Sequence, residues 1–334
     1  EPFSYREKVR IFMVWCDEKQ SIYMWRGAYP EAFMSIWTRG DFSKKVMTDN
    51  YRSCQQIQNY SNLLCDETRP LYKEVNDLSS VVMLCTTTAN WVSAVVPYLD
   101  KNKRCALLRY SNANSEIGAK ELTEKGVEFT YVPQTPISDI TTEAAWLYNA
   151  IAKHFILPTY SAYDLRDENP NEVVGNKHIL QTIKISLKHL DEYLKQADKD
   201  SFAKEVEQLA NSLGYSTKDE HCKKVYETIC DKKFHPAFNI DGLQRIAITF
   251  HSSKGLEFDQ VILFVSDYTL ETEQDICNHY VAATRAKSKL ILVHISDDGR
   301  AAIYVKNIKK ILAESNLTMR KIATVVDGIN GSKQ

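Results

Sequence analysis

Short apolar runs alternate with segments of helical periodicity along most of the chain. Runs that are rich in Val, Ile and Leu are typical of strands buried on both faces of a sheet. The predicted strands are Val9–Trp15, Val81–Cys85, Arg104–Leu108, Glu128–Val132, Gln244–Phe250, Gln260–Val265 and Lys289–Ile295. The helices predicted between them are Glu31–Trp37, Ser53–Cys65, Ala89–Asp100 and Glu116–Lys125. This alternation indicates an α/β fold with a mostly parallel sheet covered by helices on both faces.

The middle of the chain, from about Ser138 to Asp231, has a different pattern. Apolar residues recur there at helical spacing and β-branched runs are few, which predicts helix after helix. The predicted helices are Thr141–Phe155, His178–Gln196, Asp200–Leu213 and Lys218–Ile229, and the polar stretch Arg166–Gly175 predicts a loop. The strand pattern resumes near Gln244, so we interpret the chain as an α/β domain interrupted by an all-helical insertion.

Composition narrows the function without defining it. The 334 residues are 44% hydrophobic, which is enough for one large or two medium cores. The net charge of −1 gives no overall basic character, so a nucleic-acid site would be a local groove. The 8 cysteines form no Cys-x-x-Cys pair and favour reduced thiols in a cytoplasmic protein. No apolar stretch approaches the ~18 residues of a membrane span, so no membrane partner is expected.

The first segment with candidate chemistry follows the strand Val9–Trp15 and begins at Asp17. Gln20 offers an amide that could orient a water or a phosphate. Tyr23 and Trp25 with the neighbouring Arg26 are typical of a platform on which single-stranded bases stack. Taken alone, the segment fits equally well an acidic pair of the Walker B type followed by a core tryptophan.

Two further segments carry candidate phosphate ligands. Arg52 lies in Asn-Tyr-Arg-Ser at the start of a predicted helix, where helix N-termini bind anions; the alternative is an ordinary surface arginine. The segment 249–259, Thr-Phe-His-Ser-Ser-Lys-Gly-Leu-Glu-Phe-Asp, joins two predicted strands and offers many donors to phosphate oxygens. Glu257 in this segment could accept hydrogen bonds from a ribose. The alternative here is a polar loop with a solvated lysine.

A fourth segment, 280–287, reads Tyr-Val-Ala-Ala-Thr-Arg-Ala-Lys and precedes the last predicted strand. Arg285 near a nucleotide would stabilise charge on a γ-phosphate in the manner of an arginine finger. The alternative is an arginine on a helix surface. Each of the four segments has a credible alternative when it is considered alone.

Together and in this order, the four segments resemble helicase motifs III, IV, V and VI of UvrD/Rep/PcrA-type superfamily 1 DNA helicases. The family patterns are roughly G-D-x-x-Q-S-I-Y-x-W-R-G-A, N-Y-R-S, T-x-H-x-x-K-G-L-E-F and Y-V-A-x-T-R-A. The resemblance is strong over Val9–Leu63 and Arg245–Ile295 and weaker over Leu107–Asn114, where the family's Arg aligns with Tyr110. Cys16 replaces a glycine that is usual before the Asp of motif III.

The resemblance implies a role for each matching residue. It implies catalytic roles at the γ-phosphate for Gln20, Arg52 and Arg285, and it adds Gly255 and Glu257 to the nucleotide-binding set, with Glu257 at the ribose. The implied cofactors are ATP and Mg²⁺, with the metal held by residues upstream of this chain.

The resemblance also implies a DNA site. Tyr23 and Trp25 would stack on the bases of a single strand, with Arg26 nearby, while Thr249 and His251 would contact its phosphates. The implied partner is therefore single-stranded DNA.

The fold that the resemblance implies is a RecA-like parallel sheet of the P-loop NTPase type with an inserted all-helical subdomain. We expect the end of a first RecA-like domain at 1–42 and the second RecA-like domain at 43–137 and 238–320. The helical insertion is expected at 138–237 and a C-terminal tail at 321–334. The sequence contains no Gly-x-x-x-x-Gly-Lys-[Ser/Thr], so this chain alone should not hydrolyse ATP. The remainder of the first domain is expected upstream as a partner.

The expected function is an ATP-dependent helicase or translocase that moves 3′ to 5′ along single-stranded DNA. The alternative is a helicase-derived scaffold that recruits or regulates a nuclease subunit in DNA repair or anti-phage defence. Compact UvrD-like proteins of this kind occur in Gabija-type defence systems. The presence of Gln20, Arg52, Glu257 and Arg285 favours the motor, because a scaffold needs none of them.

Overall fold

The computed structural model describes residues 35, 37–40, 43, 49–65, 68–170 and 177–327. These residues form two compact units, one ending at Tyr110 and resuming at Thr249, the other comprising Ser111–Ile248. The predicted strand Val9–Trp15 lies outside the described residues, as does most of the predicted helix Glu31–Trp37. Each unit is considered by itself below.

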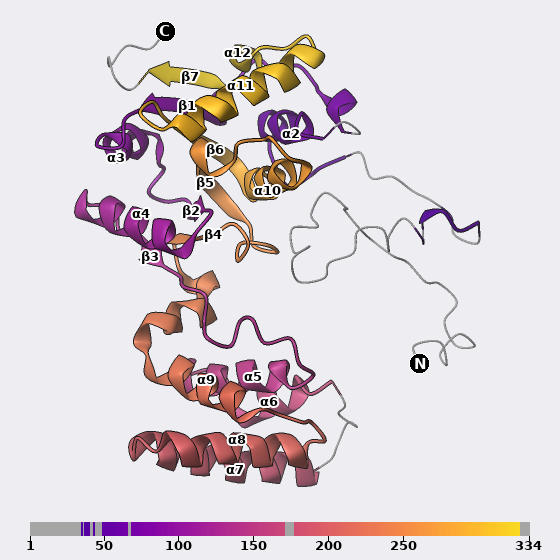
Figure 1. Cartoon of the computed structure of the whole chain (residues 1–334), viewed down its shortest axis with the longest axis vertical. Coiled ribbons are helices and arrows are strands. Elements are labelled where there is room, and N and C mark those ends of the chain that lie inside the picture. The colour runs from indigo at the N-terminus through magenta and orange to yellow at the C-terminus, as the bar shows by residue number, and fades with distance from the viewer. Residues whose placement is uncertain are drawn as a thin grey trace. The chain divides into compact units, whose positions relative to one another are not determined.

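A parallel sheet is the central feature of the fold (Figure 1). Among the described residues it has 7 strands in the order β3-β4-β2-β5-β6-β1-β7. The sheet confirms the predicted α/β class with a parallel sheet. The strands are β1 (Val81–Thr86), β2 (Cys105–Arg109), β3 (Thr130–Tyr131), β4 (Arg245–Thr249), β5 (Phe258–Phe264), β6 (Ala286–Ile295) and β7 (Thr324–Asp327).

The core of the first unit lies along β1, β5 and β6. Leu290 of β6 is in register with Val81 of β1 on one side and with Val261 of β5 on the other, and all three are fully buried. Strands covered on both faces need apolar residues at consecutive positions, which is the pattern of this sequence. The apolar runs therefore form the centre of the sheet.

The helices of the first unit cover the sheet on both faces. They are α2 (Gln55–Asn62), α3 (Trp91–Val95), α10 (Glu273–Ala283), α11 (Gly299–Glu314) and α12 (Met319–Ile322). Short 3-10 turns include η3 (Arg69–Leu71), η4 (Val96–Tyr98) and η7 (Val265–Asp267). The helices α2 and α10 contact each other on one face, and α3 lies on the other (Figure 1).

Two local differences from the predicted elements have clear causes. The helix predicted over Ala89–Asp100 is shorter, because α3 ends at Val95 and a 3-10 turn containing Pro97 follows. Proline lacks the N–H that an α-helix interior requires. The segment expected as a tail, 321–334, contains β7, which pairs in parallel with β1. Its apolar run is only two valines long, too short for periodicity to reveal a strand.

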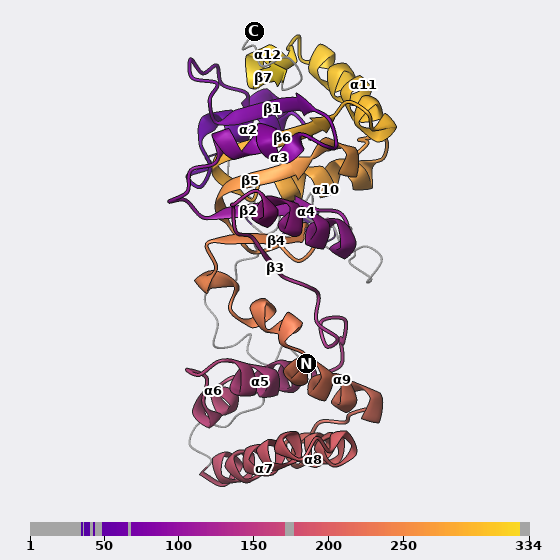
Figure 2. The same ribbon diagram turned by 90° about the vertical axis from the view of Figure 1, so that its left-hand side faces the viewer.

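The second unit is mainly helical. It contains α4 (Asn112–Glu124), α5 (Ala145–Ile156), α6 (Ala162–Asp167), α7 (Lys177–Lys195), α8 (Lys199–Ser212), α9 (Asp219–Cys230), η5 (Lys232–Phe238) and η6 (Ile240–Gly242). Figure 2 shows α7 and α8 side by side, next to α5, α6 and α9. Their shared core includes the fully buried Leu147, Ile151, Leu190 and Phe202. None of the helices in the described part of the chain is both long and apolar enough to cross a bilayer.

Helix α4 begins before its predicted start at Glu116. Its first residue is Asn112, because the Ser111 side chain accepts a hydrogen bond from the backbone N–H of Asn114 and caps the helix. Serine is a preferred residue at this position, since it satisfies an N–H that has no partner within the helix. The cap therefore explains the earlier start.

Candidate functional site

The segment with Arg52 is fixed to the start of β6 by short-range and long-range hydrogen bonds. The Asn50 side chain accepts from the backbone N–H groups of Arg52 at 2.9 Å and Ser53 at 3.2 Å. The buried Ser53 hydroxyl donates to the Ala286 carbonyl at 2.7 Å, and the next backbone N–H donates to the Lys287 carbonyl at 2.9 Å. Motif IV is therefore attached directly to the residues that follow Arg285.

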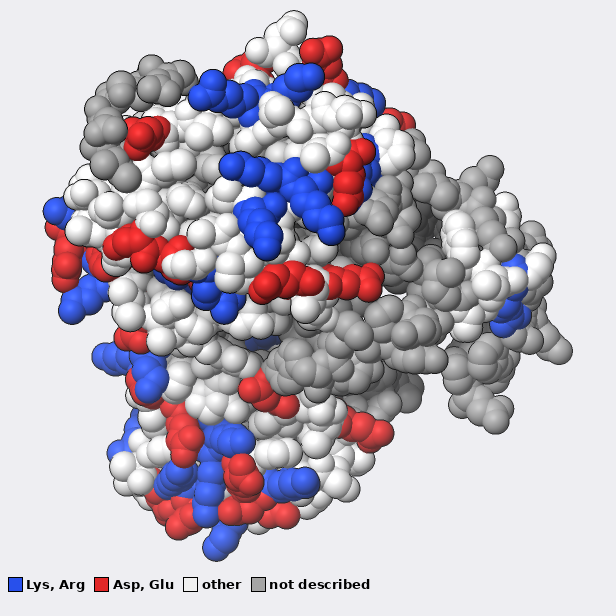
Figure 3. All heavy atoms as spheres, turned by 45° about the horizontal axis from the view of Figure 1, so that its top comes forward, with Lys and Arg blue, Asp and Glu red and all other residues white. Residues whose placement is uncertain are grey.

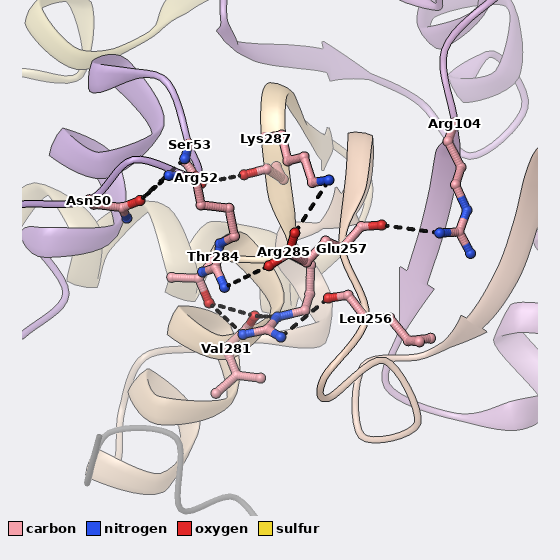
Figure 4. A network of polar contacts seen from close by, with 11 residues as sticks. Asn50, Arg52, Ser53, Arg104, Leu256, Glu257, Val281, Thr284, Arg285 and Lys287 are labelled. Carbon is pink, nitrogen blue, oxygen red and sulfur yellow. Dashed lines mark hydrogen bonds and ion pairs between the residues drawn. The ribbon is translucent and has the colours of Figure 1, made fainter. Parts of the chain in front are cut away.

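Glu257 is the centre of an ion-pair cluster (Figure 4). Its Oε1 lies 3.4 Å from Arg52 Nη1, and its Oε2 lies 3.3 Å from Lys287 Nζ. The guanidinium of Arg104 reaches the Glu257 backbone carbonyl at 3.5 Å. The cluster brings together two residues predicted for the nucleotide site, Arg52 and Glu257. It adds two that the sequence interpretation missed, Lys287 and Arg104.

The charges of this cluster favour an anionic ligand. Partial burial acts to raise the pKa of the Glu257 carboxyl, but the hydrogen bond from Lys287 and the charge of Arg52 outweigh it and hold the pKa below its usual range. Glu257 is therefore a carboxylate at neutral pH. Since Arg52, Lys287 and Arg104 all carry positive charge, the cluster keeps an excess of positive charge that can attract phosphate oxygens.

A cavity of about 320 Å³ opens beside Arg52, between α2 and α10, and is called the α2 cavity below. Its lining includes Tyr51, Arg52, Ser61, Tyr280 and Thr284. Within the described residues, Arg52 Nε and Ser61 Oγ are buried and have no hydrogen-bond partner. The Tyr51 side chain is 92% exposed. The exposed ring of Tyr51 is thus available to a ligand, while the two unpaired polar atoms are covered within side chains that line the cavity.

Arg285 takes a different position from Arg52. It is only 2% exposed, and its Nε donates to the Val281 carbonyl at 3.0 Å. Its Nη1 donates to the Leu256 carbonyl and its Nη2 to the Thr284 hydroxyl, both at 3.3 Å (Figure 4). A cation at the end of a helix compensates carbonyls that lack partners within the helix. Here Arg285 joins the end of α10 to the loop after β4, and its contact with a γ-phosphate stays a prediction.

The loop after β4 is ordered by its own hydroxyl groups. The Thr249 hydroxyl donates to the Ser252 hydroxyl at 3.0 Å and accepts from the Ser252 backbone N–H at 3.3 Å. Gly255 has a φ of +86°, with open space where a Cβ would lie. The backbone conformation, not crowding, therefore requires glycine there. This turn leads into Glu257.

His251 belongs to an aromatic group at the carboxyl ends of β2 and β4. Its ring centroid lies 3.8 Å from that of Phe250 and 6.0 Å from that of Tyr110. Tyr110 also contacts Phe250, with centroids 5.4 Å apart, and remains 48% exposed. An exposed aromatic ring beside a histidine can stack on a base, so Tyr110 joins the candidate DNA residues. Its place at the end of a strand was the available signal.

Arg109, next to Tyr110, makes contacts that stabilise the fold. Its guanidinium binds both carboxylate oxygens of Asp267, at 2.7 Å and 3.2 Å, and lies 3.8 Å from the centroid of the Phe264 ring. Because both partners are largely buried, this pair fixes the end of β2 against η7. It leaves Tyr110 as the residue of this strand end that faces solvent.

The predictions for Gln20, Tyr23, Trp25 and Arg26 fall outside the described residues and stay predictions. In the part of the chain that is described, no three His, Cys, Asp or Glu side chains gather as a metal site. Figure 3 shows basic side chains gathered in the upper part of the view beside acidic ones, and both signs mixed below. This face therefore has no uniform charge, in keeping with the near-zero net charge.

One family model matches part of the chain. Residues 246–293 match the model of the UvrD-like helicase C-terminal domain, which confirms the predicted resemblance to UvrD-like helicases. The matched segment contains Glu257 and Arg285.

Among individual proteins, the chain is 36% identical over 320 residues to the Gabija protein GajB of Bacillus cereus strain VD045. The match covers 93% of this chain and 62% of GajB, so the chain spans less than two thirds of that relative's length. A solved C-terminal domain of a possible DNA helicase from Lactobacillus strain WCFS1 is 16% identical. The match covers 77% of this chain and 94% of that one, with a TM-score of 0.34.

Proposed function

We propose that this chain belongs to a UvrD-like DNA helicase or translocase. In that protein it would supply the second half of the ATP site and part of the DNA-binding site. The observation that carries the proposal is the α2 cavity. Arg52, one member of the charged cluster, lines this cavity, and Arg52 Nε and Ser61 Oγ are buried in its wall without partners. Buried polar groups without partners are costly, so a ligand whose acceptors reach them after a small side-chain movement would stabilise them. A first domain outside these 334 residues would supply the P-loop.

The ligand that we propose for the cavity and the neighbouring Glu257 is a nucleoside triphosphate. Arg52 would donate to phosphate oxygens, the exposed ring of Tyr51 would stack on the base, and Glu257 would accept from the ribose hydroxyls. ATP supplies the phosphoanhydride bond whose hydrolysis drives movement, and Mg²⁺ would be held outside this chain. The work of Arg52 is electrostatic, because charge that develops on the phosphate is stabilised by a positioned cation. Arg285 would join it only after releasing its carbonyl partners.

The DNA side of the proposal rests on the aromatic group at the ends of β2 and β4. Tyr110 would stack on a base, while His251 and Thr249 would contact the strand's phosphates. Stacking on an aromatic ring tolerates any base, which suits a motor that moves along DNA without reading its sequence. We include 3′ to 5′ polarity in the proposal because it is usual in the family that the motifs resemble.

A second candidate function is favoured by the similarity to GajB, which extends over 93% of this chain. In that case the protein would act in anti-phage defence as a helicase-derived scaffold that recruits a nuclease. A scaffold has no need of unpaired phosphate ligands in a cavity, so we rank it below the motor. A motor that works with a nuclease in defence satisfies both observations.

The test is ATP hydrolysis stimulated by single-stranded DNA, measured on the full-length protein that contains this chain. We expect stimulated turnover in the wild type and a loss of about 10²- to 10³-fold in Arg52→Ala. Arg320→Ala, an exposed arginine on α12, is the matched control and should keep wild-type turnover. Turnover of Arg52→Ala equal to the control would contradict the assignment of Arg52. No stimulated hydrolysis by the wild type would favour the scaffold.

A further inference from the structure

A sealed polar group lies where α2, α10 and α11 meet. Tyr60 of α2, His279 of α10 and Tyr304 of α11 are each fully buried. The Tyr60 hydroxyl lies 2.6 Å from His279 Nε2 and also 2.6 Å from the Tyr304 hydroxyl. Tyr268 packs against the His279 ring with centroids 4.7 Å apart. None of these residues has a role in the proposed ATP or DNA contacts.

The direction of the hydrogen bonds follows from the donors available. Burial keeps His279 neutral, lowering its pKa to about 3, so only one ring nitrogen carries a proton. If that proton is on Nδ1, Tyr60 donates to Nε2 and Tyr304 donates to Tyr60, which leaves only Nδ1 without a partner. If it is on Nε2, that N–H donates to Tyr60 and Tyr60 donates to Tyr304, so the Tyr304 O–H has no acceptor and the bare Nδ1 has no donor. The first arrangement leaves fewer groups unsatisfied and is the one we adopt.

This group connects the helices that carry the candidate phosphate ligands. Arg52 precedes α2, in which Tyr60 lies, and Arg285 follows α10, in which His279 lies. A second connection joins the same segments at their other end, through the bond from Ser53 to Ala286. Two connections fix both the distance and the rotation between two helices, whereas a single connection lets one helix rotate relative to the other.

Polar side chains are a costly way to fill a core. Three apolar rings would fill the space without any desolvation of hydroxyl and imidazole groups, and without leaving Nδ1 unpaired. Hydrogen bonds fix direction and spacing more narrowly than apolar contact does. We propose that Tyr60, His279 and Tyr304 are positioning residues that hold α2 and α10 as one body. Arg52 and Lys287 then keep their spacing when a nucleotide enters the α2 cavity. The catalytic part of this inference rests on the proposed function.

The first experiment is Tyr60→Phe in the full-length protein, since it removes the central hydroxyl and keeps the ring. We expect kcat of DNA-stimulated ATP hydrolysis to fall about tenfold, because small misplacement of catalytic groups is costly. The dissociation constant of ADP should change less than about twofold, since ADP has no γ-phosphate to be misplaced. Tyr304→Phe removes one bond of the two and should show a smaller loss of the same kind. If Tyr60→Phe fails to fold, Tyr304→Phe provides the test in its place.

The matched control is Leu312→Ala, because Leu312 is a buried residue of α11, the helix of Tyr304, and its side chain has no polar atom that could join these hydrogen bonds. It should lower the unfolding temperature while kcat stays close to wild type. An equal fall of kcat in Tyr60→Phe and in Leu312→Ala would overturn the positioning role. A parallel loss of ADP affinity in Tyr60→Phe would overturn it as well.

A second readout does not depend on activity. In the ¹⁵N spectrum of this chain we expect Nε2 of His279 to be the unprotonated nitrogen, with a marked shift in Tyr60→Phe. A protonated Nε2 would overturn the hydrogen-bond order. Amide exchange in the first turn of α2 should speed up in Tyr60→Phe and not in Leu312→Ala; equal exchange would overturn the connection itself. If the wild type does not hydrolyse ATP, the proposed function is refuted. The spectrum and the amide exchange would still decide whether Tyr60, His279 and Tyr304 connect α2 and α10.

Discussion

Two polar groups of the first unit differ in charge and in exposure to solvent. The cluster of Arg52, Glu257 and Lys287 is charged, and its side chains are 30 to 41% exposed. The group of Tyr60, His279 and Tyr304 is neutral and sealed from solvent. Charges near solvent can exchange one partner for another at little cost, while buried hydrogen bonds between neutral groups are costly to break. The first arrangement suits a ligand that comes and goes, and the second suits geometry that must persist.

The largest effect is expected from keeping the charge of Arg52 but changing its shape. Arg52→Lys retains a cation but loses the planar fork that can contact Glu257 and a phosphate at once. We expect DNA-stimulated ATP hydrolysis to remain at least about tenfold below wild type in the full-length protein, measured by phosphate release. Wild-type turnover in Arg52→Lys would show that a positive charge at this position is enough for ATP hydrolysis. The difference between the two polar groups would then be one of charge alone.

A second effect concerns the sealed group and pH. The pKa of His279 is lowered to about 3 by burial, while an unfolded chain takes up the proton near 6.5. Stability is therefore complete above pH 6.5 and decreases as the pH falls from there toward 3, because the unfolded state binds the extra proton. Between pH 7 and pH 5 the wild type should lose about 2 kcal/mol more unfolding free energy than His279→Gln, measured by urea unfolding. An equal loss in both would mean that water or a carboxylate reaches His279.

A smaller effect is expected from neutralising Glu257. Glu257→Gln keeps the shape of the side chain and removes the charge that balances Arg52 and Lys287. Because the cluster is partly exposed, the unfolding free energy should change by less than about 1 kcal/mol. The KM for ATP should rise several-fold, since an amide is a weaker acceptor for ribose hydroxyls. A large loss of stability with an unchanged KM would make Glu257 a structural residue instead.

The smallest effect is expected in the helical unit, at the exposed ion pair between Lys199 and Glu227, whose atoms lie 2.7 Å apart. Lys199→Ala should change the unfolding free energy by less than about 1 kcal/mol and leave ATP hydrolysis unchanged. This variant gives the change in unfolding free energy and in ATP hydrolysis that is expected for an exposed charge outside both polar groups. A clear change in hydrolysis would show that the helical unit takes part in the motor.

The sequence revealed the parts of the site that lie within single motifs. Arg52, Gly255 and Glu257 were predicted from short segments, and the structure places Arg52 against Glu257. Their partner Lys287 was not predicted, although it directly follows motif VI, because a lysine after a helix has no periodicity of its own. The inward position of Arg285 could not be predicted either, since it depends on the Leu256 carbonyl, which a distant loop supplies.

The fold was also predictable where it depends on local sequence, and not where it depends on tertiary contacts. The buried strands β1, β5 and β6 each contain a run of consecutive apolar residues, which can be recognised in the sequence. The strand β7 has only two valines and becomes a strand because β1 offers it an unpaired edge. The sealed group joins three helices that are far apart in the chain, and no local pattern marks Tyr60 as the partner of His279 or Tyr304. Side chains that meet only through tertiary packing lie beyond what a single sequence shows.

The most direct test of the ATP site compares two nucleotides that differ by one phosphate. The full-length protein and its Arg52→Ala variant would be titrated with ADP and with a slowly hydrolysed ATP analogue, and the dissociation constants measured by calorimetry. We predict that Arg52→Ala weakens binding of the ATP analogue at least about tenfold, as expected for the loss of a charged hydrogen bond, and leaves ADP binding unchanged. Unchanged binding of both nucleotides would contradict the placement of the γ-phosphate at Arg52.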